Sequence, residues 1–147
     1  MNSLHAVFWA GLFGWLVAQA AKMINCFLES KRLDFSYMVS TGGMPSAHSS
    51  MASALATSLG LCEGFDSSIF ALGAAFAMVV MFDAQSVRKA AGEQAKLLNQ
   101  IVDELLREHH LSENKLKELL GHTRLEVFMG FLTGIFSAMA LFRFVHP

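Results

Sequence analysis

The sequence predicts an all-α integral membrane protein, a helical bundle with about four transmembrane helices and amphipathic helices in its loops. Hydrophobic residues make up 54% of the 147 residues and charged residues only 16%, with a mean hydropathy of +0.44. A soluble domain carries about 25% charged residues, so this composition indicates a membrane protein. Apolar runs of membrane-spanning length alternate with short polar segments. We expect residues 1–147 to form one membrane-embedded domain.

The first expected span, residues 4–28, is long enough to cross a bilayer with some tilt. It carries Gln19, Lys22 and Asn25 towards its far end, which we therefore expect to face protein or water rather than lipid. A lone lysine such as Lys22 also fits a side chain that extends to the lipid headgroups.

The second expected span, residues 45–62, is short and rich in small residues. Small side chains recur along it at every fourth position: Ser46, Ser50, Ala54 and Ser58. Such a stripe allows close helix packing, so we expect this helix to lie inside the bundle.

The third and fourth spans are expected at residues 67–83 and 126–144. Between them, residues 84–125 form the largest polar part of the chain, which we expect to hold two amphipathic helices. The second of these has Ser112 as its N-cap and ends near Gly121. In the first, apolar residues recur along one face: Val87, Ala91, Leu98, Ile101 and Leu105.

The charge distribution predicts the orientation in the membrane. Two spans separate the loop at 29–44 from the loop at 84–125, so both loops lie on the same side. They hold nine of the eleven cationic residues: Lys31, Arg32, Arg88, Lys89, Lys96, Arg107, Lys115, Lys117 and Arg124. By the positive-inside rule this loop face is cytoplasmic and both termini lie on the opposite side. The net charge of −1 suggests no nucleic acid partner, and we expect contacts with membrane lipids.

The segment "STGGMPSAHSS" precedes and opens the second span and predicts an anion site. Gly42 and Gly43 allow a turn with positive φ, and Pro45 fits the first turn of a helix. The free N–H groups and the dipole of a helix N-terminus favour an anion. The Ser46 hydroxyl adds a donor, and His48 falls in the first turn. The alternative is a plain helix cap with a histidine at headgroup level.

A second polar patch follows the third span. Arg88 and Lys89 fall in the first turn of the expected loop helix, where cations oppose the helix dipole. They therefore indicate an external partner, which is either an anionic lipid surface or a phosphate group held by bidentate arginine contacts.

The third patch is "LLGHTRLEV", at the start of the last span. His122 and Glu126 are four residues apart and would share one helix face, where the carboxylate would orient the imidazole. Alternatively, Thr123 and Glu126 form a capping box, His122 precedes the helix and the pairing on one face is lost.

Three motifs carry a family resemblance: "TGGMPSAHS", "VRKAAGEQAKLLN" and "LKELLGHTRLEV". In this order and spacing they resemble the divergent branch of the type 2 phosphatidic acid phosphatases, which are related to bacterial acid phosphatases and vanadium-dependent haloperoxidases. The resemblance extends over nearly the whole chain. It implies a phosphatase-like helical bundle that hydrolyses lipid phosphates or diphosphates without a metal or other cofactor.

The resemblance also implies roles for individual residues. Lys22 and Arg32 stand for the phosphate-binding lysine and arginine of the first block, although Leu33 replaces the proline expected after the arginine. The second block reads Pro-Ser-Ala-His instead of Pro-Ser-Gly-His, so Ser46 would contact phosphate and His48 would protonate the leaving group.

In the third block, Arg88 corresponds to a phosphate-binding arginine. Gln94 stands where the family has its nucleophilic histidine, six residues after that arginine. The nearest equivalent is His122, with Glu126 in place of the aspartate that follows four residues later.

The sequence thus favours a membrane phosphatase that cleaves a lipid phosphate or an isoprenoid diphosphate through a phosphohistidine on His122. Glu126 would orient this histidine, while His48 would act as the acid. One alternative is a protein that binds or transports a phosphorylated lipid in the same pocket without cleaving it. Another is a structural membrane protein whose basic face contacts anionic headgroups. A metal site is not expected.

Overall fold

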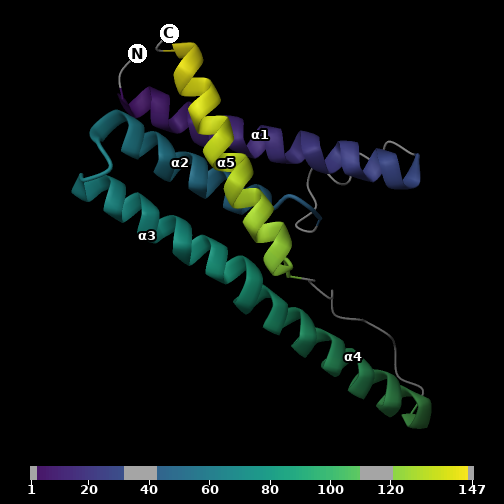
Figure 1. The fold of residues 1–147 in the computed structure, drawn as a ribbon. Helices are drawn as coiled ribbons and strands as arrows, with labels where there is room; N and C mark the ends of the chain where they lie inside the picture. Colours follow the sequence, from purple (N-terminus) through teal and green to yellow (C-terminus); the bar gives the residue numbers. More distant parts are fainter. Residues whose placement is uncertain (1–2, 32–42, 110–120, 146–147) are drawn as a thin grey trace.

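The computed structural model describes residues 3–31, 43–109 and 121–145, and these parts of the chain are helical with short connections and no strand (Figure 1). The predicted all-α fold class is therefore confirmed. The elements are α1 (Ser3–Ser30), α2 (Ala47–Glu63), α3 (Ser68–Phe82), the π-helical segment η2 (Asp83–Val87), α4 (Arg88–His109) and α5 (Arg124–Val145).

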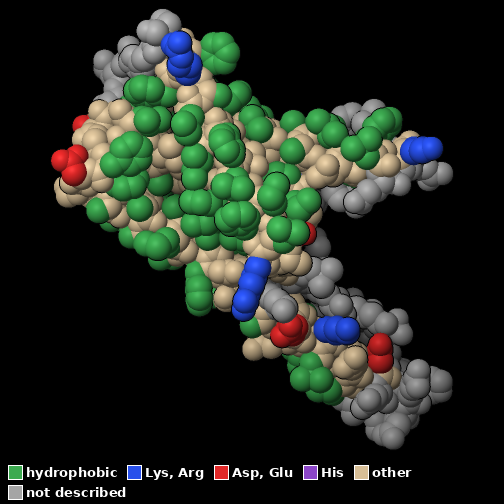
Figure 2. Space-filling model, in the orientation of Figure 1, with side chains coloured by type: hydrophobic (Ala, Val, Ile, Leu, Met, Phe, Trp, Pro, Cys, Tyr) green, Lys and Arg blue, Asp and Glu red, His purple; other side chains and the backbone are tan. Residues whose placement is uncertain are grey.

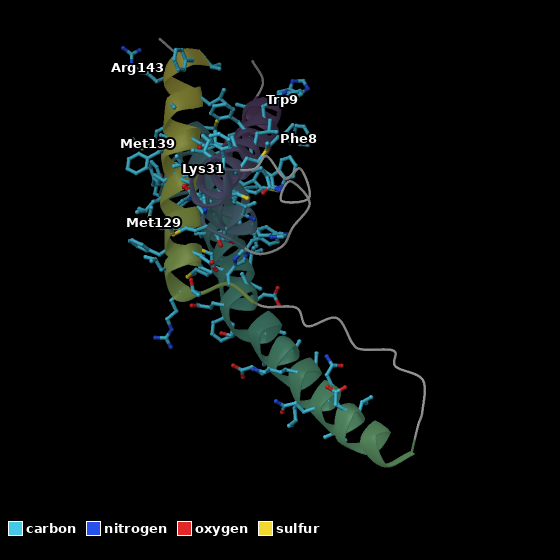
Figure 3. All side chains as sticks on the ribbon, turned by 90° about the vertical axis from the view of Figure 1, so that its right-hand side faces the viewer. Phe8, Trp9, Lys31, Met129, Met139 and Arg143 are labelled. Atoms are coloured by element: carbon cyan, nitrogen blue, oxygen red, sulfur yellow. The ribbon has the colours of Figure 1, made fainter. Side chains whose placement is uncertain are left out.

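Three helices in the described parts are long and apolar enough to cross a membrane, compared with about four expected. These candidate spans are His5–Leu28, Ser68–Asp103 and Arg124–Val145. Hydrophobic side chains cover most of the visible face of the bundle, whereas charged side chains lie at its edges and along α4 (Figure 2). On α5, Met129 and Met139 point away from the bundle (Figure 3), as side chains in contact with lipid would. The chain is a membrane protein.

The helix α2 was expected to be a span but is shorter than a membrane-spanning helix. It has 17 residues, fewer than the roughly 20 that a bilayer requires. It lies at the centre of the bundle and contacts α1, α3 and α5. Its composition explains this position, because its buried residues are alanines, serines and a glycine, which let neighbouring backbones approach closely.

The predicted small-residue stripe is buried along the whole of α2. Ser50 Oγ donates a hydrogen bond of 2.7 Å to the Gly14 carbonyl oxygen on α1. Ser53 Oγ lies 3.0 Å from the Phe131 carbonyl oxygen on α5. Two serine hydroxyls therefore link the central helix to backbone carbonyls on either side.

Two glycines on α5 allow the backbone of this helix to approach α2 closely. A Cβ atom on Gly130 would collide with the Ser46 carbonyl oxygen, and one on Gly134 would collide with Ser53 Oγ and the Ser50 carbonyl oxygen. Gly130 and Gly134 are four residues apart and thus lie on one face of α5. They act as the small-xxx-small motif typical of membrane helix pairs.

The third span and the loop helix form one continuous rod rather than two separate helices. Asp83 keeps α-helical dihedrals (φ −57°, ψ −48°) at the end of α3, and η2 leads directly into α4. Arg88 and Lys89 therefore follow another helical segment and do not face the dipole of a free N-terminus, contrary to the interpretation made from the sequence. Beyond η2, α4 runs outward from the bundle (Figure 1). The second predicted loop helix lies outside the described residues, except for Gly121.

Candidate functional site

The N-terminus of α2 is closed by a serine cap. Ser46 is the N-cap, and its Oγ accepts a hydrogen bond of 3.4 Å from the Ser49 backbone N–H. The Ser49 hydroxyl also lies 3.0 Å from Ser46 Oγ. Both serines are fully buried, so the first turn of α2 starts inside the protein.

The residues around this cap differ in part from the prediction. Gly43 has a φ of +89°, which confirms the expected glycine turn. Pro45 precedes the N-cap and so lies outside the helix rather than in its first turn. The first turn does include His48, and its side chain is exposed.

The N-terminus of α5 combines two arrangements that the sequence presents as alternatives. Thr123 N–H donates to Glu126 Oε2 over 2.8 Å, and Glu126 N–H donates to Thr123 Oγ1 over 3.2 Å, which is a complete capping box. The same Glu126 Oε2 lies 3.2 Å from Nδ1 of His122. His122 precedes the helix, but the turn before α5 brings its ring to the capping carboxylate. The expectation that capping would abolish the pairing was therefore wrong.

His122 is held in place by its backbone as well as by its ring. Its N–H donates a hydrogen bond of 3.0 Å to the carbonyl oxygen of Ala84, inside η2. The residue is only 2% exposed, and Nε2 is itself buried. Because Nδ1 faces the carboxylate, Nε2 lies on the opposite edge of the ring, inside the protein.

Three separate chain segments meet at this point. The Ser46 N–H donates a 3.0 Å hydrogen bond to the Glu126 carbonyl oxygen, which joins the start of α2 to the start of α5. The bond from His122 to Ala84 adds η2. The starts of α2 and α5 are thus fixed relative to one another by backbone hydrogen bonds, which are insensitive to side-chain flexibility.

The first helix contributes a buried cation to the same region. Lys22 is 3% exposed, so it does not extend to the headgroups. The charge of Glu126 acts on its ammonium group. A Cβ atom on Gly43 would lie 4.0 Å from Lys22 Cδ, which places the lysine stem beside the glycine turn. The Lys22 side chain is therefore buried beside the turn that precedes α2, where the charge of Glu126 partly offsets the cost of its burial.

Asn25 is a positioning residue that the sequence analysis did not assign to the site. Its Nδ2 donates a 3.1 Å hydrogen bond to the Met44 carbonyl oxygen, which fixes the turn before α2 to α1. The sequence feature that could have identified Asn25 is its spacing from Lys22, because residues three positions apart lie on the same face of a helix.

Not every predicted site residue falls within the described structure. Arg32 and Gly42 lie outside the described residues, and the Arg88 side chain is likewise not described. The region described here brings together Lys22, Ser46, His122 and Glu126. Among the described residues, no group of three or more His, Cys, Asp and Glu side chains is placed to hold a metal ion.

Comparison with known proteins gives two matches. The family model "Divergent PAP2 family" matches residues 4–137, in agreement with the resemblance of the three motifs. "Uncharacterized membrane protein YuiD" of Bacillus subtilis (strain 168) is 44% identical over 140 residues, which cover 88% of this chain and 89% of that protein. No solved structure matches the chain.

Proposed function

The chain belongs to the divergent PAP2 family, and from this premise we propose that it hydrolyses a lipid phosphate or an isoprenoid diphosphate in the membrane. The observation that carries the proposal is the pair of buried His122 and partly exposed Glu126, with 3.2 Å between Nδ1 and Oε2. A histidine oriented by a carboxylate through one nitrogen presents the other as a nucleophile or base. Lys22, also buried and acted on by Glu126, supplies positive charge in the same region.

The proposed reaction has two steps with one covalent intermediate. His122 Nε2 attacks the phosphorus atom, the N–P bond forms, and the P–O bond to the lipid leaving group breaks. Glu126 stabilises the positive charge that develops on the imidazole ring. Water then attacks the phosphohistidine, the N–P bond breaks, and inorganic phosphate leaves with His122 restored.

The remaining predicted residues have supporting roles in this proposal. His48 gives its proton to the leaving oxygen in the first step and accepts one from the attacking water in the second. Lys22, Arg32 and Arg88 neutralise the phosphate oxygens. In this proposal Gly42, Gly43 and the Ser46 cap contact the phosphate, because a helix N-terminus attracts anions. The cationic loops suggest that the candidate site faces the cytoplasm.

Two observations favour a second candidate, binding or transport of a phosphorylated lipid without cleavage. The His48 side chain is exposed whereas His122 Nε2 is buried, so the two imidazoles have different surroundings. In addition, Gln94 occupies the sequence position of the family's nucleophile. A protein that kept the phosphate pocket but lost the reaction would have these features.

The test is phosphate release by the purified, detergent-solubilised protein. Substrates are phosphatidate, lysophosphatidate and isoprenoid diphosphates, assayed beside His122→Ala and His48→Ala. His5→Ala is the matched control, because His5 is an exposed histidine near the opposite end of α1. Loss of the nucleophile should lower kcat by on the order of 10³-fold or more, while His5→Ala should retain full activity.

The two candidate functions give different results in this experiment. Release that His122→Ala abolishes, in a protein with an unchanged melting temperature, supports the phosphatase. Release that survives His122→Ala contradicts the assigned nucleophile. Saturable binding of the lipid phosphates with no release by the wild-type protein supports the second candidate.

A further inference from the structure

A groove separates the end of the third span from the start of the fifth helix. It has a volume of about 380 Å³ and lies between α3 and η2 on one side and the first two turns of α5 on the other. Apolar side chains, including Met78, Phe82, Phe128 and Phe131, form most of its lining. Met78, Phe82 and Phe128 are each more than half exposed, so the groove opens on the outside of the bundle.

The two ends of this groove differ in polarity. Arg124 and Gln85 are its polar lining residues; Arg124 begins α5, and Gln85 lies in η2, just beyond the end of α3. No carboxylate lines the groove in the described part of the chain. A guanidinium group at the end of a span lies at headgroup level, and the apolar walls extend from there towards the membrane interior. The groove therefore matches a ligand with one anionic end and a hydrocarbon chain.

The polar end of the groove is next to the candidate site. Gln85 directly follows Ala84, whose carbonyl oxygen accepts the His122 N–H hydrogen bond. Arg124 begins α5 two residues after His122. The backbone hydrogen bond that positions the histidine thus also holds the two walls of the groove together.

We propose that this groove binds the hydrocarbon chain of a phosphorylated bilayer lipid, with Arg124 as the contact for its phosphate group. Arginine suits this position because its planar guanidinium makes bidentate hydrogen bonds to phosphate. The lipid enters sideways from the bilayer between α3 and α5, and its headgroup arrives beside His122. The inference takes the class of ligand from the proposed function but does not require that the ligand be cleaved.

Photocrosslinking tests the groove without turnover. The full-length protein is placed in phosphatidylcholine nanodiscs with a trace of phosphatidate that carries a diazirine in one acyl chain, and the crosslinked residues are mapped by mass spectrometry. The diacylglycerol with the same diazirine chain serves as the probe without phosphate. We expect crosslinks from phosphatidate to concentrate on the end of α3 and the start of α5.

The phosphate contact and the binding of the hydrocarbon chain are each tested with one variant and one matched control. Arg124→Gln should lower crosslinking of the phosphatidate probe by about tenfold, to the level of diacylglycerol, whereas Arg143→Gln at the other end of α5 should not. Met78→Trp narrows the groove and should lower crosslinking of both probes. Met139→Trp places the same residue on an exposed part of α5 outside the groove and should change neither.

The outcomes separate the groove from the phosphatase. Crosslinks spread evenly over the exposed surface of α1, α3 and α5, unchanged in Arg124→Gln and Met78→Trp, would overturn the proposal and indicate ordinary lipid contacts. Crosslinks in the groove, together with no phosphate release by the wild-type protein, would support lipid binding in the groove and contradict the proposed phosphatase activity. Phosphate release that neither groove variant alters would support the phosphatase and overturn the groove as its entry route.

Discussion

The side chain of Glu126 makes two hydrogen-bonding contacts and also acts electrostatically on a third group, and Glu126→Gln removes its charge while keeping its shape. Its Oε2 accepts the Thr123 N–H at 2.8 Å and lies 3.2 Å from His122 Nδ1. Its charge also acts on the buried ammonium group of Lys22. The amide oxygen of glutamine can accept the same two hydrogen bonds, so this variant isolates the electrostatic contribution from capping.

The expected magnitudes follow from these contacts. A hydrogen bond to a charged group contributes about 1.5–3 kcal/mol and a neutral one about 0.5–1.5 kcal/mol. The imidazole should therefore lose about 1–1.5 kcal/mol of stabilisation as positive charge develops on it, which is about a tenfold fall in kcat. Removing one partner of a fully buried ion pair costs about 3–5 kcal/mol. Since the Glu126 side chain is 21% exposed, we expect a smaller loss of unfolding free energy, about 1–2 kcal/mol.

The assay combines phosphate release with unfolding in detergent for four proteins: wild type, Glu126→Gln, Lys22→Met and the double variant. The double variant should be more stable than the sum of the two single changes predicts, because it leaves no buried charge unmatched. An unchanged kcat in folded Glu126→Gln would refute the role of the carboxylate at His122. Stability losses that add to within about 0.5 kcal/mol would refute the coupling of Lys22 to Glu126.

Three other predictions concern packing and orientation. Gly134→Ala should lower the unfolding free energy by about 1–3 kcal/mol, measured by unfolding in detergent, because its methyl group would collide with α2; a wild-type value would contradict the close approach of α5. Ser50→Ala should cost about 0.6–1.7 kcal/mol in the same assay through loss of the bond to Gly14, and no loss would mean that this bond contributes nothing. In intact cells, a membrane-impermeant thiol reagent should label His5→Cys but not Lys31→Cys, in a background without the native cysteines, and the opposite pattern would reverse the predicted orientation.

The sequence was informative wherever a short repeat or spacing determines the structure. The apolar runs located α1, α3 and α5, because a helix satisfies its own backbone hydrogen bonds inside a bilayer and needs a long, mostly apolar run of side chains to cross it. The repeat from Ser46 to Ser58 indicated the central helix, since small side chains are needed where helices touch. Local chemistry also indicated the capping box at Glu126, because capping depends on residues only three positions apart, whereas the cap at Ser46 was not predicted.

Other features depend on which segments meet. The continuity of α3 with α4 could not be deduced from the sequence, because the polar stretch after Phe82 fits both a loop and a helix. The burial of Lys22, instead of its extension to the headgroups, also appears only in the folded chain, where it feels the charge of Glu126 from 104 positions away in the sequence. Likewise, only the folded chain shows that one carboxylate oxygen serves both the cap and His122.

The sequence by itself therefore determined the class of protein, its family motifs and the helices on which the candidate site lies. Periodicity and capping are local properties, and neighbouring residues are enough to specify them. The tertiary structure decided which side chains are buried together and which carbonyl oxygens accept the N–H groups of Ser46 and His122. Burial and long-range hydrogen bonds depend on the relative placement of distant helices, and this placement is set by the packing of α1, α3 and α5 around α2.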